Sequence, residues 1–321
     1  MAQSRSSRRA SDDLAVQTTN DDATSCKRYA TQKGYWEDDF VKYFCRTSDR
    51  KSPEINRGYF ARVRLYQLLV EKFLSLAGEE SQVINFGAGY DTLYWTLSAR
   101  SLRPKLLVEV DFEAVTARKC YYISSKEPLR EVLVDPVIEK DSISSKHYKL
   151  LSGDLRDMAT VGEKLLSSGV DTSLPTLFLT ECVLVYMDPD KSREVIRWAG
   201  NNFSTALFLN YEPIFPDDSF GLTMQANLAH RGCSLLGINA CPDLESQKQR
   251  FLGNGWQCTW ALDMAEVYQQ LPKNEIQRIE RLEFLDEKEL LIQLLQHYCA
   301  SCGYTDKKRI GLDKVRLSKN S

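Results

Sequence analysis

The sequence predicts an α/β protein built on a doubly wound sheet of mostly parallel strands. Five apolar runs of four to six residues, rich in branched and aromatic side chains, recur at residues 83–86, 106–111, 148–151, 176–181 and 206–210. Such runs are typical of strands buried on both faces of a parallel sheet. Segments of helical character lie between them, for example residues 193–203. Strands that alternate with helices indicate right-handed crossovers and therefore a doubly wound sheet.

Further helices are expected on both sides of this series of strands. Leu65, Leu69, Phe73 and Leu76 recur at spacings of three and four residues, which places them on one helix face within a helical part at 26–80. After the fifth strand we expect a helical insertion, a strand, a charged helix and a final strand, over residues 218–252, 257–263, 286–296 and 298–304. We therefore predict one domain over residues 26–306.

Both ends of the chain are polar. Residues 1–25 contain Ser, Thr, Asp and Arg with almost no apolar side chains, a composition that predicts a disordered tail. Residues 307–321 are expected to form a second polar tail.

Composition excludes several classes of protein. The 42 Lys and Arg residues against 44 Asp and Glu residues give a net charge of -2, so we expect no nucleic-acid partner. No apolar stretch approaches the length of a membrane helix, and we expect no membrane association. The odd number of cysteines, nine, favours reduced thiols in the cytoplasm over a disulfide framework. Nothing in the sequence requires more than a monomer.

The first candidate binding element is the glycine turn Gly87-Ala88-Gly89, which directly follows the first predicted strand. Glycine adopts positive φ and lets a ligand approach the backbone closely. Ligands of doubly wound sheets bind beyond the carboxyl ends of the strands, where this turn would lie. Thr92 stands where a dinucleotide fingerprint has its third glycine, so a tight turn that binds nothing remains an alternative.

Two acidic residues at later strand ends suggest contacts with a nucleoside. Asp111 ends the second strand and can accept hydrogen bonds from ribose hydroxyls, which NAD and S-adenosylmethionine share, although it can also cap a helix. Asp154 can accept from the exocyclic amine of adenine while the N–H of Leu155 meets a ring nitrogen; a solvated turn is the alternative. Taken in order, three strand ends offer sites for a glycine turn, a ribose and an adenine.

Glu181 ends the most apolar strand and precedes another apolar stretch. A buried carboxylate has to be paired or hydrogen-bonded, because an isolated buried charge is costly. The ammonium group of a methionine moiety would satisfy it, and so would an internal salt bridge with Lys or Arg.

The available histidines favour methyl transfer over hydride transfer. A hydroxy-acid dehydrogenase usually needs a histidine proton relay, but His147, His230 and His297 do not follow these strands. A sulfonium already activates its methyl group, so the enzyme mainly has to align a nucleophile with it. A carboxylate nucleophile is ionised at neutral pH and needs no general base. An NAD-dependent dehydrogenase remains an alternative.

Cys299 and Cys302 have the spacing of half a zinc site. No second pair follows, so we interpret them as structural and predict no metal.

Several motifs, in order along the chain, resemble one known family. They are Cys26-Lys27-Arg28-Tyr29, Gly34-Tyr35-Trp36, the run over 53–62 (PEINRGYFAR), Asn85-Phe86-Gly87-Ala88-Gly89, Gly153-Asp154-Leu155-Arg156-Asp157, the run over 181–187 (ECVLVYM) and Leu244-Glu245-Ser246-Gln247-Lys248. Together they resemble the leucine carboxyl methyltransferases of type 2A protein phosphatases, from about Cys26 to Tyr304. The resemblance implies a class I methyltransferase (Rossmann-like) fold with added helical N-terminal and lid regions.

The resemblance also implies an activity and a role for each matched residue. It implies methyl esterification of the C-terminal leucine α-carboxylate of the phosphatase catalytic subunit, with S-adenosylmethionine as cofactor and an effect on phosphatase assembly. The resemblance implies that Lys27 and Arg62 hold the cofactor's carboxylate, Gly87 makes the glycine-turn contact, Asp111 binds the ribose, Asp154 and Leu155 contact the adenine, and Glu181 binds the cofactor's amino group. It implies that Tyr186 lies near the transferring methyl group and the incoming leucine, and that Tyr186 and Arg62 are the catalytic residues.

Two alternatives to this activity remain open. The same superfamily includes a carboxyl methyltransferase that acts on a modified transfer RNA guanosine, usually with an additional β domain for which this chain lacks the length. A relative that binds the phosphatase without catalysis is the other alternative.

Overall fold

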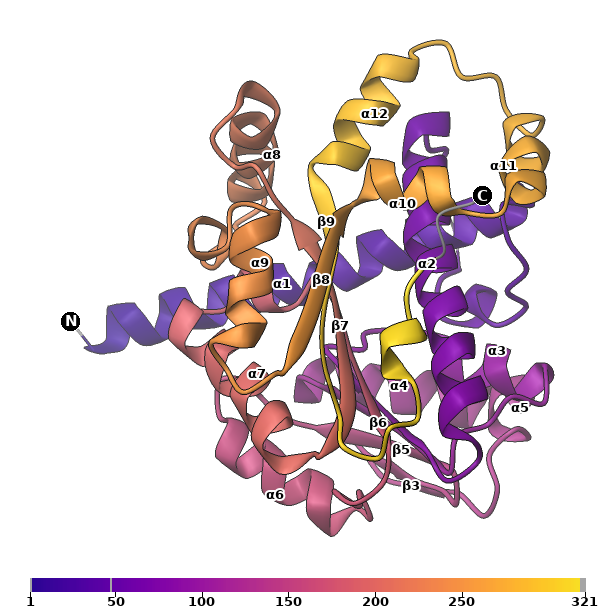
Figure 1. Ribbon diagram of the computed structural model, residues 1–321, viewed down its shortest axis with the longest axis vertical. Helices are drawn as coiled ribbons and strands as arrows, with labels where there is room; N and C mark the ends of the chain where they lie inside the picture. The colour runs from indigo at the N-terminus through magenta and orange to yellow at the C-terminus, as the bar shows by residue number, and fades with distance from the viewer. Residues whose placement is uncertain (1, 47, 318–321) are drawn as a thin grey trace.

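Within residues 2–46 and 48–317, which the computed structural model describes, nine strands form one sheet in the order β3-β4-β5-β2-β1-β6-β7-β9-β8 (Figure 1). The strands are β1 (Gln82–Phe86), β2 (Leu106–Asp111), β3 (Val137–Ile138), β4 (Ile143–Ser144), β5 (Tyr148–Ser152), β6 (Thr176–Glu181), β7 (Thr205–Pro213), β8 (Cys258–Asp263) and β9 (Tyr298–Asp306). The five central strands β5, β2, β1, β6 and β7 are parallel, and β3, β4, β8 and β9 add antiparallel edges. The predicted doubly wound sheet and all seven predicted strands are confirmed.

Helices cover both faces of the sheet (Figure 1). They are α1 (Ala2–Gln32), α2 (Pro53–Ala77), α3 (Leu93–Ala99), α4 (Glu113–Ser125), α5 (Glu127–Arg130), α6 (Met158–Ser167), α7 (Pro189–Asn202), α8 (Ser219–His230), α9 (Leu244–Leu252), α10 (Met264–Gln270), α11 (Lys273–Glu280) and α12 (Lys288–Gln296). The expected insertion after the fifth strand consists of α8 and α9, and the expected charged helix is α12.

The alternation of side chains along the strands divides the apolar core into two layers. Val83 and Leu177 face the larger layer, which includes side chains of α2, α3, α4, α10 and α12. Their neighbours Ile84 and Phe178 face the other layer, against α6, α7 and α9. Because both faces are covered, the central strands are mostly apolar, with a few buried polar side chains such as Glu109 and Asn210. The carboxyl edge of the sheet is left for further polar side chains.

The expectation of a disordered tail over residues 1–25 is wrong for the residues that the structure describes. They belong to α1, a helix of 31 residues. Its second half lies across the carboxyl edge of the sheet and is held by polar contacts, such as Asn20 accepting a hydrogen bond from the N–H of Tyr90 at 2.9 Å. The polar side chains of this segment are ordered by contacts with distant parts of the chain. The composition of the segment alone could not predict these contacts.

The expected polar tail over residues 307–321 is also wrong up to residue 317. A short 3-10 helix, Leu312–Lys314, follows β9, and the side chains of Leu312 and Val315 are fully buried. They join the same core as α2. Residues 318–321 lie outside the described part of the chain.

In the described part of the chain, no helix combines the length and the apolar character needed to cross a membrane.

Candidate active site

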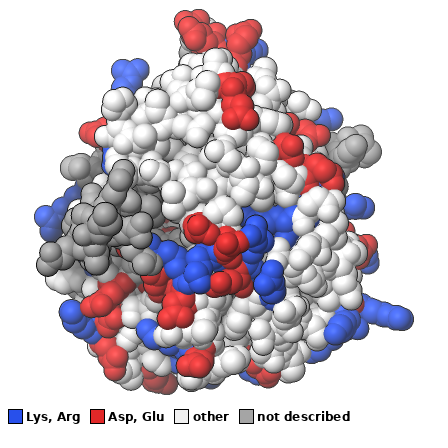
Figure 2. Space-filling view, turned by 90° about the vertical axis from the view of Figure 1, so that its left-hand side faces the viewer, with Lys and Arg blue, Asp and Glu red and all other residues white. Residues whose placement is uncertain are grey.

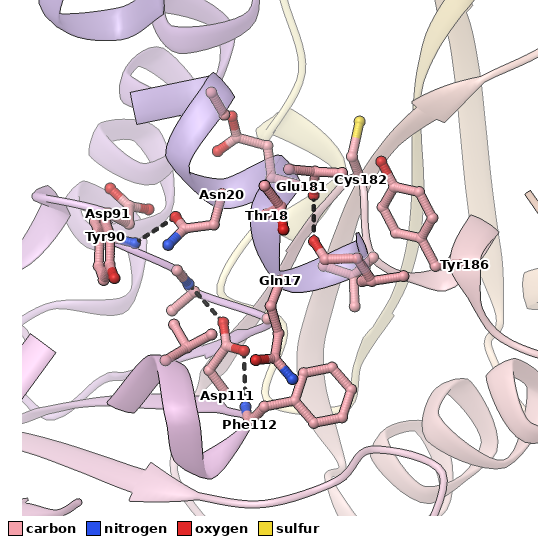
Figure 3. A pocket seen from close by; sticks show the side chains of 18 of the residues that line it. Gln17, Thr18, Asn20, Tyr90, Asp91, Asp111, Phe112, Glu181, Cys182 and Tyr186 are labelled. Carbon is pink, nitrogen blue, oxygen red and sulfur yellow. Dashed lines mark hydrogen bonds between the residues drawn. The ribbon is translucent and has the colours of Figure 1, made fainter. Parts of the chain in front are cut away.

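A cavity of about 710 Å³ lies at the carboxyl edge of the parallel strands. Its walls are the residues that follow β1, β2, β5 and β6, together with parts of α1, α2, the end of α8 and β9 (Figure 3). All eight site residues predicted from the sequence line this one cavity: Lys27, Arg62, Gly87, Asp111, Asp154, Leu155, Glu181 and Tyr186. The volume is in the range of small-molecule sites.

The glycine turn needs its glycines. Gly87 and Gly89 have φ values of 64° and 51°, in the left-handed region. A Cβ atom on Gly87 would lie 2.5 Å from a methyl group of Val183, and one on Gly89 would lie 2.3 Å from the side-chain oxygen of Asn20. The turn therefore places bare backbone against the cavity.

Asp111 is fixed by the turn that faces it. Its two carboxylate oxygens accept hydrogen bonds from the N–H groups of Gly89 and Phe112, each at 2.7 Å. Burial raises the pKa of Asp111, and the two backbone N–H groups oppose that rise. Each carboxylate oxygen has a second lone pair, so the group can still accept from a ligand in the cavity.

Asp154 is already bound by a neighbouring side chain. Arg156 donates to both of its carboxylate oxygens through Nε, at 2.8 and 3.0 Å, and also through Nη2 at 2.7 Å. The same guanidinium lies 5.4 Å from the ring centre of Phe112. About a third of the Asp154 side chain stays exposed. Leu155 is buried beside it and belongs to the core layer of α6 and α7.

Glu181 is the centre of a charged triad at the other end of the cavity. Its carboxylate contacts Lys27 Nζ of α1 at 3.0 Å and Arg62 Nε of α2. Although burial opposes ionisation, these two cations lower the pKa of Glu181 to about 2. The internal salt bridge considered for Glu181 is therefore present, and its partners are the two cations that the family resemblance places on the cofactor's carboxylate.

Aromatic rings hold Arg62 in place. Its guanidinium carbon lies 4.8 Å from the ring centre of Tyr211 and 5.4 Å from that of Tyr59. With two cations and one carboxylate, the triad carries a net positive charge toward the cavity. It can therefore attract an anionic group while Glu181 offers oxygens to a cationic one.

Tyr186 and Cys182 form the wall beyond the triad (Figure 3). Burial raises the pKa of Tyr186 well above its usual value, so the phenol stays protonated and keeps a proton that it can donate in a hydrogen bond. Cys182 has a φ of 57° where β6 ends, and its N–H donates to the carbonyl of Tyr211 at 2.7 Å. Burial raises the pKa of the Cys182 thiol to about 11, which keeps it from acting as a thiolate at neutral pH.

Sequence reasoning predicted Lys27 of α1 but missed the residues that α1 contributes before it. Gln17, Thr19 and Asn20 line the cavity, and Gln17 points toward Asp111 and Phe112 (Figure 3). Tyr298 of β9 and Arg231, just after α8, were missed as well. None of these positions lies at a strand end of the parallel sheet or in an apolar pattern, so no local signal marks them.

The structure places the three histidines and the Cys299/Cys302 pair away from this chemistry. No histidine is among the described residues that line the cavity. His297 instead contacts Asp218 at 2.8 Å. Cys299 and Cys302 are buried in β9, and across the described residues no cluster of three or more His, Cys, Asp or Glu side chains is arranged to hold a metal ion.

Comparison with known proteins agrees with this geometry. A family model described as leucine carboxyl methyltransferase matches residues 15–200. Leucine carboxyl methyltransferase 1 of Rattus norvegicus is 44% identical over 311 residues, which cover 95% of this chain and 94% of that protein. The tRNA wybutosine-synthesizing protein 4 of the same species is 37% identical over 88% of this chain, but this chain covers only 43% of that longer protein.

A solved structure confirms the type of fold. A Thermobifida fusca protein assigned as a methyltransferase superimposes with a TM-score of 0.50 over 83% of this chain and 92% of its own, at 15% identity. At that identity the likeness concerns the fold alone, and it confirms the expected methyltransferase fold. The family match and the relative that is similar along nearly its whole length go further: the chain belongs to the leucine carboxyl methyltransferase family.

Proposed function

We propose that the protein transfers a methyl group from S-adenosylmethionine to the α-carboxylate of a C-terminal leucine in the catalytic subunit of a type 2A protein phosphatase. The observation that carries this proposal is the single cavity that joins the Lys27–Arg62–Glu181 triad to Asp111 and the glycine turn. Family membership supports carboxyl methylation, because the relatives carry that activity in their names.

The described residues fit such a cofactor. The triad offers positive charge for a carboxylate and carboxylate oxygens for an ammonium group, which a methionine moiety carries side by side. Asp111 faces the cavity as the acceptor for ribose hydroxyls, next to a turn whose Cβ positions are blocked. Asp154 and Leu155 line the same cavity, with Arg156 and Phe112 beside them, and we propose that they hold the adenine.

The chain's own residues then have limited work to do. S-adenosylmethionine supplies a methyl group already activated by its sulfonium. The incoming leucine carboxylate is ionised at neutral pH, so no side chain has to remove a proton. The protonated phenol of Tyr186 can donate a hydrogen bond to that carboxylate. Catalysis rests mainly on alignment of the two reactants in a cavity shielded from water.

The identity of the substrate rests on the family resemblance. We propose that methylation of the phosphatase tail regulates assembly of the phosphatase holoenzyme. We also propose that this protein carries out the methylation in the cytoplasm and acts as a monomer. No nucleic acid is required for this activity.

The proposal is tested with methyl-labelled S-adenosylmethionine and the intact phosphatase catalytic subunit. We expect label that is released by mild base, as an ester is, and none on a control subunit that lacks its terminal leucine. Base-stable label, or equal labelling of the truncated control, would reject the proposal. Binding to the subunit with no turnover would favour a non-catalytic relative, and tight NAD binding without S-adenosylmethionine binding would favour a dehydrogenase.

The transfer RNA alternative has one observation in its favour. The relative named for wybutosine synthesis is 37% identical over most of this chain. Labelling of transfer RNA in place of the phosphatase tail, with the same cofactor preparation, would select this alternative.

A further inference from the structure

The middle of α1, residues 13–24, lies over the cofactor part of the cavity. Residues from Asp13 to Thr24 line it, opposite the glycine turn and Asp111 (Figure 3). Asn20 accepts from the N–H of Tyr90 at 2.9 Å, and the hydroxyl of Thr19 is hydrogen-bonded to Tyr186. This segment therefore contacts both the nucleoside end of the site and the tyrosine proposed to face the incoming leucine.

Three ion pairs tie this segment to separate parts of the domain. Asp13 accepts from Nη1 and Nη2 of Arg156, at 2.6 and 2.9 Å. Asp21 pairs with Arg118 of α4 at 3.3 Å, and Asp22 pairs with Arg231 at 2.9 Å. Figure 2 views the molecule from the side where α1 projects, and basic and acidic side chains lie next to one another in the middle of that face.

The segment has little apolar attachment to the core. Leu14 is 65% exposed, whereas Thr24 and Ala30, nearer the helix C-terminus, are buried. The hydroxyls of Thr18 and Thr24 donate to carbonyls of α1 itself. The Asp21–Arg118 and Asp22–Arg231 pairs are largely exposed, and such pairs contribute little to stability and weaken with salt, whereas the Asp13–Arg156 pair is only about a quarter exposed. The remainder of α1 is attached differently, through Lys27 to Glu181 and through Arg28 to the carbonyls of Lys42 and Cys45.

We propose that residues 13–24 of α1 are a cover, latched by these three ion pairs, that has to lift before cofactor can enter or leave. The inference rests on the proposed cofactor. When the cover opens, the three ion pairs break while the contacts of Lys27 and Arg28 remain. The C-terminal part of α1 therefore acts as the hinge. Opening of the cover sets the rate of cofactor exchange.

A reversible crosslink tests the cover directly. A Cβ atom on Gly232 would lie 3.6 Å from the Cβ of Ala15, within the spacing that a disulfide requires. In the double variant Ala15→Cys/Gly232→Cys, oxidation should lock the segment to the loop after α8. Gly232 has a φ of 74°, which is unfavourable for cysteine, so the reduced double variant, which carries the same strain, is the reference for the exchange rate. We expect release of preloaded labelled S-adenosylmethionine into an excess of unlabelled cofactor to slow at least tenfold, and reduction to restore the original rate.

Controls separate the crosslink from other effects of oxidation. The single variant Ala15→Cys and the unmodified protein pass through the same treatment, and peptide mass spectrometry identifies the new disulfide, because Cys233 lies beside the engineered position. If the crosslinked form exchanges cofactor as fast as its reduced form, the cover is rejected.

Charge removal provides a second test that does not depend on a crosslink. In the triple variant Asp13→Asn/Asp21→Asn/Asp22→Asn we expect labelled S-adenosylmethionine to be released at least threefold faster. Added salt should speed release from the unmodified protein, but it should have no such effect on the triple variant. The control is Glu80→Gln, which removes an exposed acidic partner of Lys105 outside α1. Unchanged release and unchanged salt dependence in the triple variant would also reject the cover.

The outcomes also separate this inference from the proposed function. If the unmodified protein does not bind S-adenosylmethionine, the proposed function fails. If it binds and methylates normally but exchange ignores both the crosslink and the charges, only the cover fails.

Discussion

Glu181 has an unusual position for a carboxylate, since it is nearly buried and contacts two cations from two different helices. Its partners Lys27 and Arg62 come from regions that the sequence separates by more than a hundred residues from Glu181. The sequence could therefore predict that this carboxylate needs a partner, because its neighbours are apolar. It could not predict whether the partner would be a ligand or a side chain, since only the folded helices bring Lys27 and Arg62 to it.

We expect Glu181→Gln to be destabilising at neutral pH and to change how stability depends on pH. The pKa of Glu181 is lowered to about 2 in the folded protein, against roughly 4.3 when unfolded. A lowered carboxyl pKa contributes stability above the unfolded pKa and loses it as pH falls toward the folded pKa. The contribution is on the order of 3 kcal/mol at pH 7 and falls by about half near pH 3.

Urea unfolding of both proteins at neutral pH and near pH 3 measures this difference. The gap between wild type and variant should narrow on acidification, while Glu163→Gln, an exposed acid on α6, should show little gap at any pH. A gap of constant size across this range would contradict the assigned role of the triad.

Asp111→Asn tests the ribose contact at the same scale. The amide keeps the shape of the carboxylate but loses its charge and one acceptor, while the N–H groups of Gly89 and Phe112 still need partners. Charged hydrogen bonds are worth about 1.5–3 kcal/mol, so affinity for S-adenosylmethionine should fall roughly 10- to 100-fold. Titration calorimetry measures the loss, and an unchanged dissociation constant would remove Asp111 from the binding site.

At the scale of elements, the glycine turn between β1 and α3 is the part of the site that should tolerate substitution least. We expect Gly87→Ala to abolish cofactor binding, because its φ of 64° is unfavourable for alanine and its Cβ would lie 2.5 Å from Val183. Gly169→Ala is the matched control, since Gly169 also has positive φ but faces open space. Binding should survive in the control at a modest cost in stability. If Gly87→Ala binds as well as the control, close packing of this turn is not needed.

The elements that the sequence predicted and those that it missed differ in where their stabilising contacts lie. The strand Thr176–Glu181 is mostly apolar because neighbouring elements bury it on both faces. Its composition alone therefore predicts a buried strand. The helix Ala2–Gln32 has no apolar stripe, and its middle is held by Arg118, Arg156 and Arg231 from distant segments. The Leu312–Lys314 helix contributes only isolated apolar side chains, too few to produce a period.

At the scale of the whole molecule, the helical additions and the sheet share one core. The layer that contains Val83 and Leu177 also contains Phe60 and Leu65 of α2 and Leu291 of α12. The cavity is bounded by these same parts, since Lys27 and Arg62 come from the helices while Asp111 and Glu181 come from the sheet. We therefore propose that the helical N-terminal part and the sheet form one domain, and we expect the molecule to unfold as a unit.

Calorimetry with and without S-adenosylmethionine tests whether the helices and the sheet unfold together. A ligand that binds only the folded state stabilises it by about 2.7 kcal/mol at a free concentration 100-fold above its dissociation constant. Because the ligand would contact helices and sheet together, we expect one unfolding transition that moves as a whole to higher temperature. S-adenosylhomocysteine should act in the same way, while adenosine alone should give a smaller shift because it lacks the groups that the Lys27–Arg62–Glu181 triad would hold. Two transitions of which only one responds would mean that the helical part folds apart from the sheet and takes no part in holding the cofactor.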